Sequence, residues 1–258
     1  MNKVRGAFAA GKAFIPFVTG GDPDLATTEK LLYALDEAGA DIIEIGIPFS
    51  DPIAEGPTIE AADERALRAG CTVDKLFDMV AGARAGIKTP LLFMTYYNPV
   101  FVYGVMRFTE RCAACGIDGL IVPDLPFEER DELLSPCAGH GLELISLIAP
   151  TSQERIENIA RSSSGFLYCV SSLGVTGVRR AIDDSARRMV AQVKGIADIP
   201  CAVGFGISTP EQAREIAGFA DGVIIGSAMV RIAAEHGTKC VEPVFEYAKG
   251  IKRAIADL

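Results

Sequence analysis

One carboxylate inside an apolar run is the residue of this chain best placed to move protons. Residues 42–47 (IIEIGI) resemble a buried β-strand in length and β-branching, and Glu44 lies in their middle. Burial without a positive partner raises the pKa of a carboxyl group towards neutrality, where it can both give and take a proton. Alternatively, Glu44 is a core carboxylate paired with a Lys or Arg. Two more carboxylates, Asp51 and Glu55, follow on a loop punctuated by Pro and Gly.

Glycines after two late strands form a pattern that suits a phosphate group. Gly206 follows the predicted strand 201–203, and Gly226-Ser227 follows the predicted strand 223–225 immediately before a helix. Glycine lets backbone N–H groups approach an anion, and a helix N-terminus directs unpaired N–H groups and a positive dipole end at it. Glycine after a strand is also ordinary turn chemistry. Two such loops at successive strand ends favour a phosphate site.

Several aromatic residues gather near predicted strand ends. They could be core residues, or together they could line an apolar pocket for a flat aromatic ligand. These residues are Phe17, Phe49, Tyr96, Tyr97, Tyr168 and Phe205.

Strand-like and helix-like segments alternate along the chain and must position these groups. The predicted strands are residues 14–19, 42–47, 91–95, 120–122, 144–148, 166–170, 201–203 and 223–225. The predicted helices are 1–11, 24–38, 58–69, 73–85, 108–115, 127–140, 152–161, 182–194, 209–217, 227–235 and 243–258. Eight βα units in this length predict an α/β fold, a single (β/α)₈ barrel with an extra N-terminal helix and additional helices, in one domain, 1–258. The alternative fold, a doubly wound open sheet, would require the motif Gly-x-Gly-x-x-Gly after the first strand, but the sequence there is TGGDP.

Composition sets further bounds. The formal net charge of −9 argues against nucleic-acid binding by bulk electrostatics. No run reaches the ~20 apolar residues of a membrane span, and the N-terminus lacks an apolar signal region. Seven cysteines with only a lone Cys112-x-x-Cys115 pair fit reduced thiols in a cytoplasmic protein. With two histidines, His140 and His236, both at predicted helix ends, neither a metal site nor a His-based triad is expected.

Six segments, in order along nearly the whole chain, closely resemble the tryptophan synthase alpha chain family. Of these, PFSDP is the most specific. The segments are residues 14–23 (FIPFVTGGDP), 43–52 (IEIGIPFSDP), 96–99 (YYNP), 174–177 (GVTG), 204–208 (GFGIS) and 226–227 (GS). The resemblance implies a (β/α)₈ barrel that cleaves indole-3-glycerol phosphate to indole and glyceraldehyde 3-phosphate in tryptophan biosynthesis. It also implies an α₂β₂ complex with a beta chain that receives the indole through a tunnel. Pyridoxal phosphate is expected only in that beta chain, and no cofactor in this one.

The same resemblance assigns the catalytic carboxylates. Glu44 corresponds to the family's general acid–base residue. Glu55 stands where the family usually has Asp, at the carboxylate that accepts the indole N–H and balances the charge developing there. Asp51 corresponds to an earlier Asp of the motif and is expected to shape the loop.

The resemblance also assigns the substrate contacts. Thr176 matches a loop threonine that orients the catalytic carboxylate. The residues matching the indole side are Phe17, Tyr96, Tyr168 and Phe205, and those matching phosphate contacts are Gly177, Gly206, Gly226 and Ser227.

Two alternatives remain open from the sequence. A different enzyme on a phosphate-binding barrel, such as a sugar-phosphate isomerase, would explain the glycines but not the whole segment from Glu44 to Glu55. A non-catalytic protein that keeps only a partner-activating surface would not need Glu44 and Thr176 intact.

Overall fold

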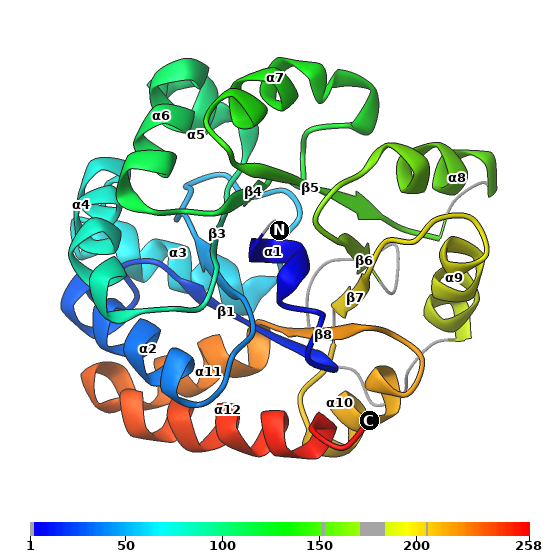
Figure 1. Cartoon of the computed structure of the whole chain (residues 1–258). Coiled ribbons are helices and arrows are strands. Elements are labelled where there is room, and N and C mark those ends of the chain that lie inside the picture. Colours follow the sequence, from blue (N-terminus) through cyan, green and yellow to red (C-terminus); the bar gives the residue numbers. More distant parts are fainter. Residues whose placement is uncertain (1–2, 151–152, 171–183, 205) are drawn as a thin grey trace.

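Eight parallel strands close into a barrel in sequential order in the computed structural model, which describes residues 3–150, 153–170, 184–204 and 206–258 (Figure 1). The strands are β1 (Ala13–Thr19), β2 (Ile43–Gly46), β3 (Leu91–Met94), β4 (Gly119–Ile121), β5 (Glu143–Ile148), β6 (Leu167–Val170), β7 (Cys201–Gly204) and β8 (Gly222–Ile225). All eight predicted strands are confirmed, and no strand end shifts by more than one residue. The β1–β8 pairing, which joins Ala13 to Gly222, closes the barrel and rules out the open-sheet rival.

Alternate strand residues face the barrel interior, as the pleat of a strand requires. On β1, Phe14 and Val18 join the core shared with the helices, whereas Ala13 and Ile15 join the core inside the barrel. The stagger of an eight-stranded barrel then arranges the inward residues in layers of four from alternate strands. The strand register places one layer as Glu44, Ile121, Tyr168 and Ile224, and the layer above it as Phe17, Met94, Leu147 and Gly204. Glu44 is therefore the one residue with a carboxyl group in these two layers.

Helices surround the barrel, and those that follow strands run back to the next strand (Figure 1). They are α2 (Leu25–Glu37), α3 (Pro57–Arg68), α4 (Val73–Ala83), α5 (Tyr97–Tyr103), α6 (Val105–Cys115), α7 (Asp131–Gly139), α8 (Gln153–Ser162), α9 (Asp184–Lys194), α10 (Pro210–Ala217), α11 (Ser227–His236) and α12 (Val241–Ile255). Short 3₁₀ turns at Arg84–Gly86, Phe127–Glu129 and Gly237–Lys239 complete the helical elements of the described residues. Helix starts follow capping chemistry, since Asp24, Thr72 and Thr209 each accept a backbone N–H of the first turn.

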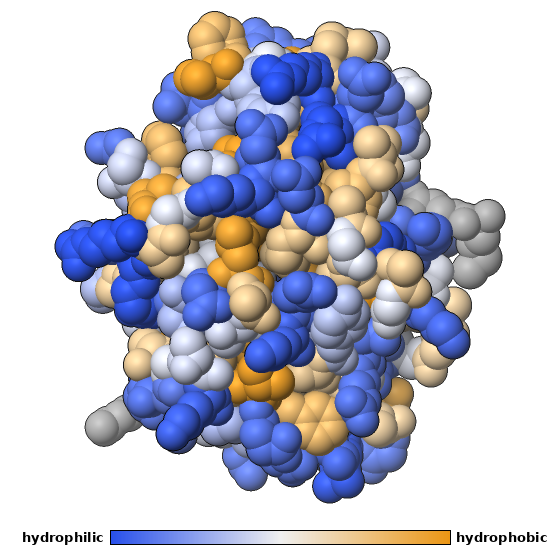
Figure 2. Space-filling view, turned by 90° about the vertical axis from the view of Figure 1, so that its left-hand side faces the viewer, coloured by the Kyte–Doolittle hydropathy of each residue, from blue (hydrophilic) through white to orange (hydrophobic). Residues whose placement is uncertain are grey.

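The face over the left-hand helices of Figure 1 is mainly hydrophilic, with hydrophobic side chains in smaller groups (Figure 2). Among the described residues, no helix combines the length and apolar character needed to cross a membrane.

The leading helix is shorter than predicted. The sequence predicts a helix over residues 1–11, but α1 covers only Lys3–Gly6 and the chain then turns, with Gly11 at a φ of 136°. Val4 is fully buried in the barrel-interior core, and the Phe8 ring lies 5.4 Å from that of Phe166. This segment therefore closes the amino end of the barrel, which α1 covers in Figure 1.

Candidate active site

Glu44 lies at the bottom of the site, in the middle of β2. It is 0% exposed, and neither carboxylate oxygen has a hydrogen-bond partner among the described residues. Burial, and secondarily the negative charge of Glu55, raises its pKa well above the ordinary value. The alternative of an ion pair with Lys or Arg finds no partner in the described part of the chain. The raised pKa favours the protonated form of the carboxyl group, and no described side chain competes for its proton.

Glu55 is carried by the loop between β2 and α3, which is held against the end of β3. The Ala54 N–H donates to the Tyr96 hydroxyl at 2.9 Å, and the Phe49 ring lies 5.5 Å from the Tyr96 ring. Glu55 is only 7% exposed, and burial followed by the charge of Glu60 raises its pKa to about 7. A carboxylate of this kind changes charge near neutral pH. Asp51, by contrast, is exposed and accepts a hydrogen bond from Ser50 within the loop.

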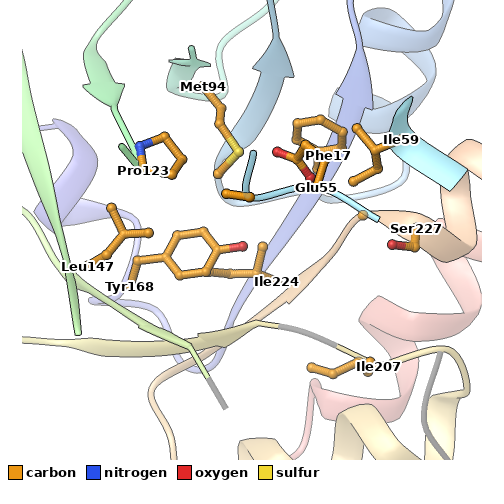
Figure 3. A pocket seen from close by; sticks show the side chains of 13 residues that line it. Phe17, Glu55, Ile59, Met94, Pro123, Leu147, Tyr168, Ile207, Ile224 and Ser227 are labelled. Carbon is orange, nitrogen blue, oxygen red and sulfur yellow. The ribbon is translucent and has the colours of Figure 1, made fainter. Parts of the chain in front are cut away.

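A pocket opens above Glu44 at the carboxyl ends of the strands and separates into an apolar end and a polar end. In Figure 3 Met94, Pro123 and Leu147 gather at one end, and Ser227 lies at the other, with the Glu55 carboxylate beside the Phe17 ring. The Tyr168 hydroxyl points into the space between them. The full lining is Phe17, Ala54, Glu55, Ile59, Met94, Pro123, Leu147, Tyr168, Gly206, Ile207, Ile224, Gly226 and Ser227.

Two strand glycines make room for the pocket's aromatic rings. A Cβ atom on Gly46 would lie 2.6 Å from Cζ of Phe17, and one on Gly204 would lie 2.8 Å from the Tyr168 hydroxyl. Real Cβ atoms do not approach other atoms so closely, so both rings depend on glycine at the neighbouring strand. The Phe17 and Tyr168 rings thus lie across the barrel mouth and form part of the floor and wall of the pocket.

The polar end has the features of an anion site. Gly226 is the N-cap of α11 and provides no side-chain cap, so the first N–H groups of the helix are not capped from there. The first intrahelical bond to Gly226 O comes from the Met229 N–H, two residues beyond Ser227. Gly206, at a φ of 83°, adopts a left-handed conformation that favours glycine and lies in the same lining. A phosphate bound here would meet the positive end of α11 and the Ser227 hydroxyl.

The structure brings most of the predicted site residues together. Six of them line the pocket, namely Phe17, Glu55, Tyr168, Gly206, Gly226 and Ser227. Tyr96 is buried behind the Glu55 loop instead and anchors it, and Glu44 lies one layer below the rim. Thr176, Gly177 and Phe205 lie outside the described residues.

Sequence reasoning missed the aliphatic part of the lining. Met94, Leu147 and Ile224 occupy inward positions at the carboxyl ends of β3, β5 and β8. Counting alternate residues along each predicted strand would have identified them as pocket residues. Asp63 of α3 was also missed; it is 5% exposed and lies close enough to Glu55 for the two charges to interact. His140 and His236 lie at the C-terminal ends of α7 and α11, away from the strand ends that form the pocket.

Three comparisons with known proteins agree over nearly the whole chain. The family model of the tryptophan synthase alpha chain matches residues 7–256. The tryptophan synthase alpha chain of Lacticaseibacillus casei is 47% identical over 255 residues, covering 99% of this chain and 96% of that protein. The crystal structure of tryptophan synthase subunit alpha from Legionella pneumophila matches with a TM-score of 0.90 at 36% identity, covering 100% of both chains. A chain of the tryptophan synthase complex from Pyrococcus furiosus matches with a TM-score of 0.87 at 38% identity, covering 93% of this chain and 98% of that one.

Proposed function

Since the chain belongs to the tryptophan synthase alpha chain family, the lyase that cleaves indole-3-glycerol phosphate in tryptophan biosynthesis, we propose that Glu44 and Glu55 carry out this cleavage in the pocket at the barrel mouth. The family assignment sets aside both sequence alternatives, a sugar-phosphate isomerase and a non-catalytic protein. Roles for individual residues follow from the pocket geometry.

The two ends of the pocket fix how the substrate lies. The indole ring occupies the apolar end among Met94, Pro123 and Leu147, because a flat apolar group gains most from leaving water there. The phosphate binds at Ser227 and the N-terminus of α11. The glycerol chain then spans the middle of the pocket, above Glu44.

Glu44 serves as both acid and base. Its proton goes to the indole ring carbon that bears the glycerol chain, which turns the ring into a cationic indolenine that can accept electrons. The Glu44 carboxylate then takes the proton of the adjacent glycerol hydroxyl as a C=O bond forms and the C–C bond breaks. The electron pair of that bond neutralises the ring, so indole and glyceraldehyde 3-phosphate leave and Glu44 ends protonated again. A buried carboxyl group with a raised pKa suits this double transfer.

Glu55 balances the charge that develops on the ring. Its carboxylate lies at the pocket wall beside Phe17 and accepts a hydrogen bond from the indole N–H. This hydrogen bond becomes stronger as the ring becomes cationic. With a pKa of about 7, Glu55 is about half ionised at neutral pH and mostly ionised in the mildly alkaline range. Tyr96 contributes by holding the loop at Ala54, one residue before Glu55.

The observation that carries the proposal is the fully buried Glu44 carboxyl group, which has no hydrogen-bond partner in the described part of the chain and lies directly below a pocket with an apolar and an anion-binding end. The test is indole release from indole-3-glycerol phosphate by the isolated chain and by the chain with a beta chain. Ribose 5-phosphate and similar sugar phosphates serve as a control panel. Turnover of sugar phosphates with no indole release under either condition would contradict it.

A beta chain is the proposed partner. Four large apolar side chains of the Glu55 loop and of the segment after β3 are 61–76% exposed, an arrangement typical of an interaction surface. They are Ile53, Phe101, Val102 and Met106. The Pyrococcus furiosus structure is of a tryptophan synthase complex, which supports association of this chain with a beta chain. The α₂β₂ stoichiometry of that assembly is part of the proposal. Pyridoxal phosphate belongs to the beta chain in this proposal.

Size-exclusion chromatography with a beta chain tests that surface. Phe101→Asp should abolish co-elution, whereas Leu258→Asp, a change at an exposed apolar residue of the C-terminus, should not. Equal co-elution of both variants would place the partner surface elsewhere.

We also propose that residues 1–258 form one domain in the cytoplasm. The strands of the one barrel extend from Ala13 to Ile225. The C-terminal helix α12 packs on α2, near the N-terminus, and on α10. The seven free, buried cysteines suit a reducing compartment.

A further inference from the structure

Asp124 is a half-buried carboxylate after β4 that the proposed chemistry does not use. It lies in a turn in which the Leu125 N–H donates to Val122 O at 3.2 Å, and its neighbour Pro123 lines the apolar end of the pocket (Figure 3). One of its carboxylate oxygens accepts the backbone N–H of Tyr97 at 2.8 Å. The side chain therefore connects the end of β4 to the segment that follows β3.

That hydrogen bond caps helix α5 from the neighbouring strand. Tyr97 is the first residue of α5, and its N-cap residue, Tyr96, makes no side-chain hydrogen bond to the first turn. The first N–H groups of a helix have no partner within the helix, and an acidic side chain stabilises them through a hydrogen bond and through its charge. Asp124 thus supplies the cap that Tyr96 does not.

The same hydrogen bond fixes the base of the Tyr96 side chain. The Tyr97 N–H and the Tyr96 carbonyl belong to one planar peptide group, which also includes the Cα atom of Tyr96. Asp124 accepts the N–H of this group, and the Thr95 hydroxyl donates to its carbonyl at 3.1 Å. The peptide group is therefore held at both of its polar ends, and the Tyr96 side chain starts from a fixed point.

Tyr96 in turn holds the loop that carries Glu55. Its hydroxyl accepts the Ala54 N–H at 2.9 Å, one residue before Glu55. Glu55 lines the pocket and is only 7% exposed. A path of hydrogen bonds therefore joins Asp124, through the peptide group of Tyr96 and Tyr97 and then the Tyr96 hydroxyl, to the loop next to Glu55.

We propose that Asp124 is a positioning residue for the cleavage: by capping α5 it holds Tyr96, and through Tyr96 it keeps Glu55 at the pocket wall. Asp124 is not among the residues that line the pocket, so it acts without touching the substrate. The inference rests on the proposed role of Glu55. Loss of the cap should lower the rate of cleavage and leave the phosphate end at Ser227 in place.

Two substitutions of Asp124 measure what the hydrogen bond contributes. Asp124→Asn keeps an oxygen that accepts the Tyr97 N–H, and since Asn and Asp cap helices about equally well, kcat should stay within about threefold of the parent. Asp124→Ala removes the acceptor, and kcat should fall by about tenfold, because a small displacement of a catalytic group is costly. KM should change by less than about threefold in both variants, since α5 does not form the phosphate end.

A double-mutant cycle tests whether Asp124 acts through Tyr96. Tyr96→Phe keeps the ring but removes the acceptor of the Ala54 N–H, and kcat should fall by about tenfold or more. In the Tyr96→Phe background, Asp124→Ala should lower kcat by less than a further factor of about two, because the path is already broken. Effects that multiply to about a hundredfold would show that the two residues act independently and would overturn the proposal. An unchanged kcat in Asp124→Ala alone would overturn it as well.

A second pair of variants removes the donor in place of the acceptor. Proline is favoured at the first position of a helix and has no N–H, so Tyr97→Pro deletes the donor, whereas Tyr97→Ala keeps it and likewise lacks the Tyr97 ring. The kcat of Tyr97→Pro should be about tenfold below that of Tyr97→Ala. This pair decides the question should Asp124→Ala fail to fold, and equal kcat values in the two variants would overturn the proposal. Glu129→Ala, a change at an exposed residue of the same connection between β4 and α7, is the control and should match the parent.

A parallel measurement on Glu55→Ala keeps the two hypotheses apart. If Glu55→Ala is inactive and Asp124→Ala matches the parent, only the role of Asp124 is refuted. Full activity in Glu55→Ala would refute the role of Glu55 and, with it, the proposal that Asp124 positions it.

Discussion

Adding one methyl group at Gly46 should damage the indole end of the pocket. A Cβ atom there would lie 2.6 and 2.8 Å from two atoms of the Phe17 ring, up to about 0.8 Å closer than ordinary contact at 3.4 Å. The ring packs among Ile59, Ala62 and Val230, so it has little room to move away. In Gly46→Ala it must shift by a similar distance or the strand must move.

The magnitude follows from that overlap. Overpacking of a filled core costs about 1–3 kcal/mol of unfolding free energy. A displacement approaching 1 Å at the wall that positions the substrate should lower kcat/KM by about tenfold or more. Both effects arise from a single added carbon, because Phe17 is at once a core residue and a pocket residue.

The matched control is Gly82→Ala in the last turn of α4, where a Cβ atom would have no neighbour within 4 Å. This change should stabilise the protein by about 0.5–1 kcal/mol through helix propensity, with kcat/KM unchanged. Urea unfolding and initial rates of indole release measure both quantities. Equal stability and equal kcat/KM in Gly46→Ala and the parent would show that Phe17 does not depend on Gly46, and the reasoning would fail.

Three further predictions concern charge in the pocket. Ser227→Asp should raise KM at least about tenfold and abolish competition by inorganic phosphate, because a carboxylate repels the phosphate and occupies the same helix N–H groups. An unchanged KM would show that the phosphate binds elsewhere. Glu55→Ala and Glu55→Gln should both cripple indole release, whereas Glu55→Asp should stay within about tenfold, since charge and acceptor are kept; full activity in Glu55→Ala would direct the search to Asp51. The pH profile of kcat/KM should be bell-shaped, rising through about pH 7 as Glu55 ionises and falling at higher pH as Glu44 loses its proton; activity that keeps rising well above pH 7 without a basic limb would contradict a protonated Glu44.

Much of the fold could be predicted because the periodicity of apolar residues distinguishes strands from helices within a short segment. Residues 42–47 show a buried strand and a buried charge in a single stretch, so both β2 and the environment of Glu44 followed from the sequence. Helix α5 was missed, because its first turn carries Pro99 in a YNP segment typical of a loop, although proline is tolerated in a first turn. The predicted leading helix was wrong beyond Gly6, because closure of the barrel floor, rather than local propensity, decides the path of that segment.

The site was less predictable where it depends on distant packing. Helical spacing alone places Asp63 on the face of α3 that carries Ile59 and Ala62, and leaves Glu64 beside it exposed, but spacing does not say which group Asp63 faces. That Glu55 lies close enough to Asp63 for the two charges to interact is revealed only by the assembled barrel. Tyr96 was predicted to form part of the pocket wall, but it lies behind the Glu55 loop and holds that loop through the Ala54 N–H.

The measurement that tests the account most directly is single-turnover cleavage of indole-3-glycerol phosphate by Glu44→Gln, with Glu37→Gln on an exposed helix end as the control. Glutamine keeps the shape of the side chain but cannot shuttle a proton. The account predicts that the single-turnover rate constant of cleavage falls by about 10³-fold or more, with binding of a non-cleavable substrate analogue retained and the Glu37→Gln control at the parent rate. Turnover within tenfold of the parent in Glu44→Gln would remove Glu44 from the acid–base role and contradict the central claim.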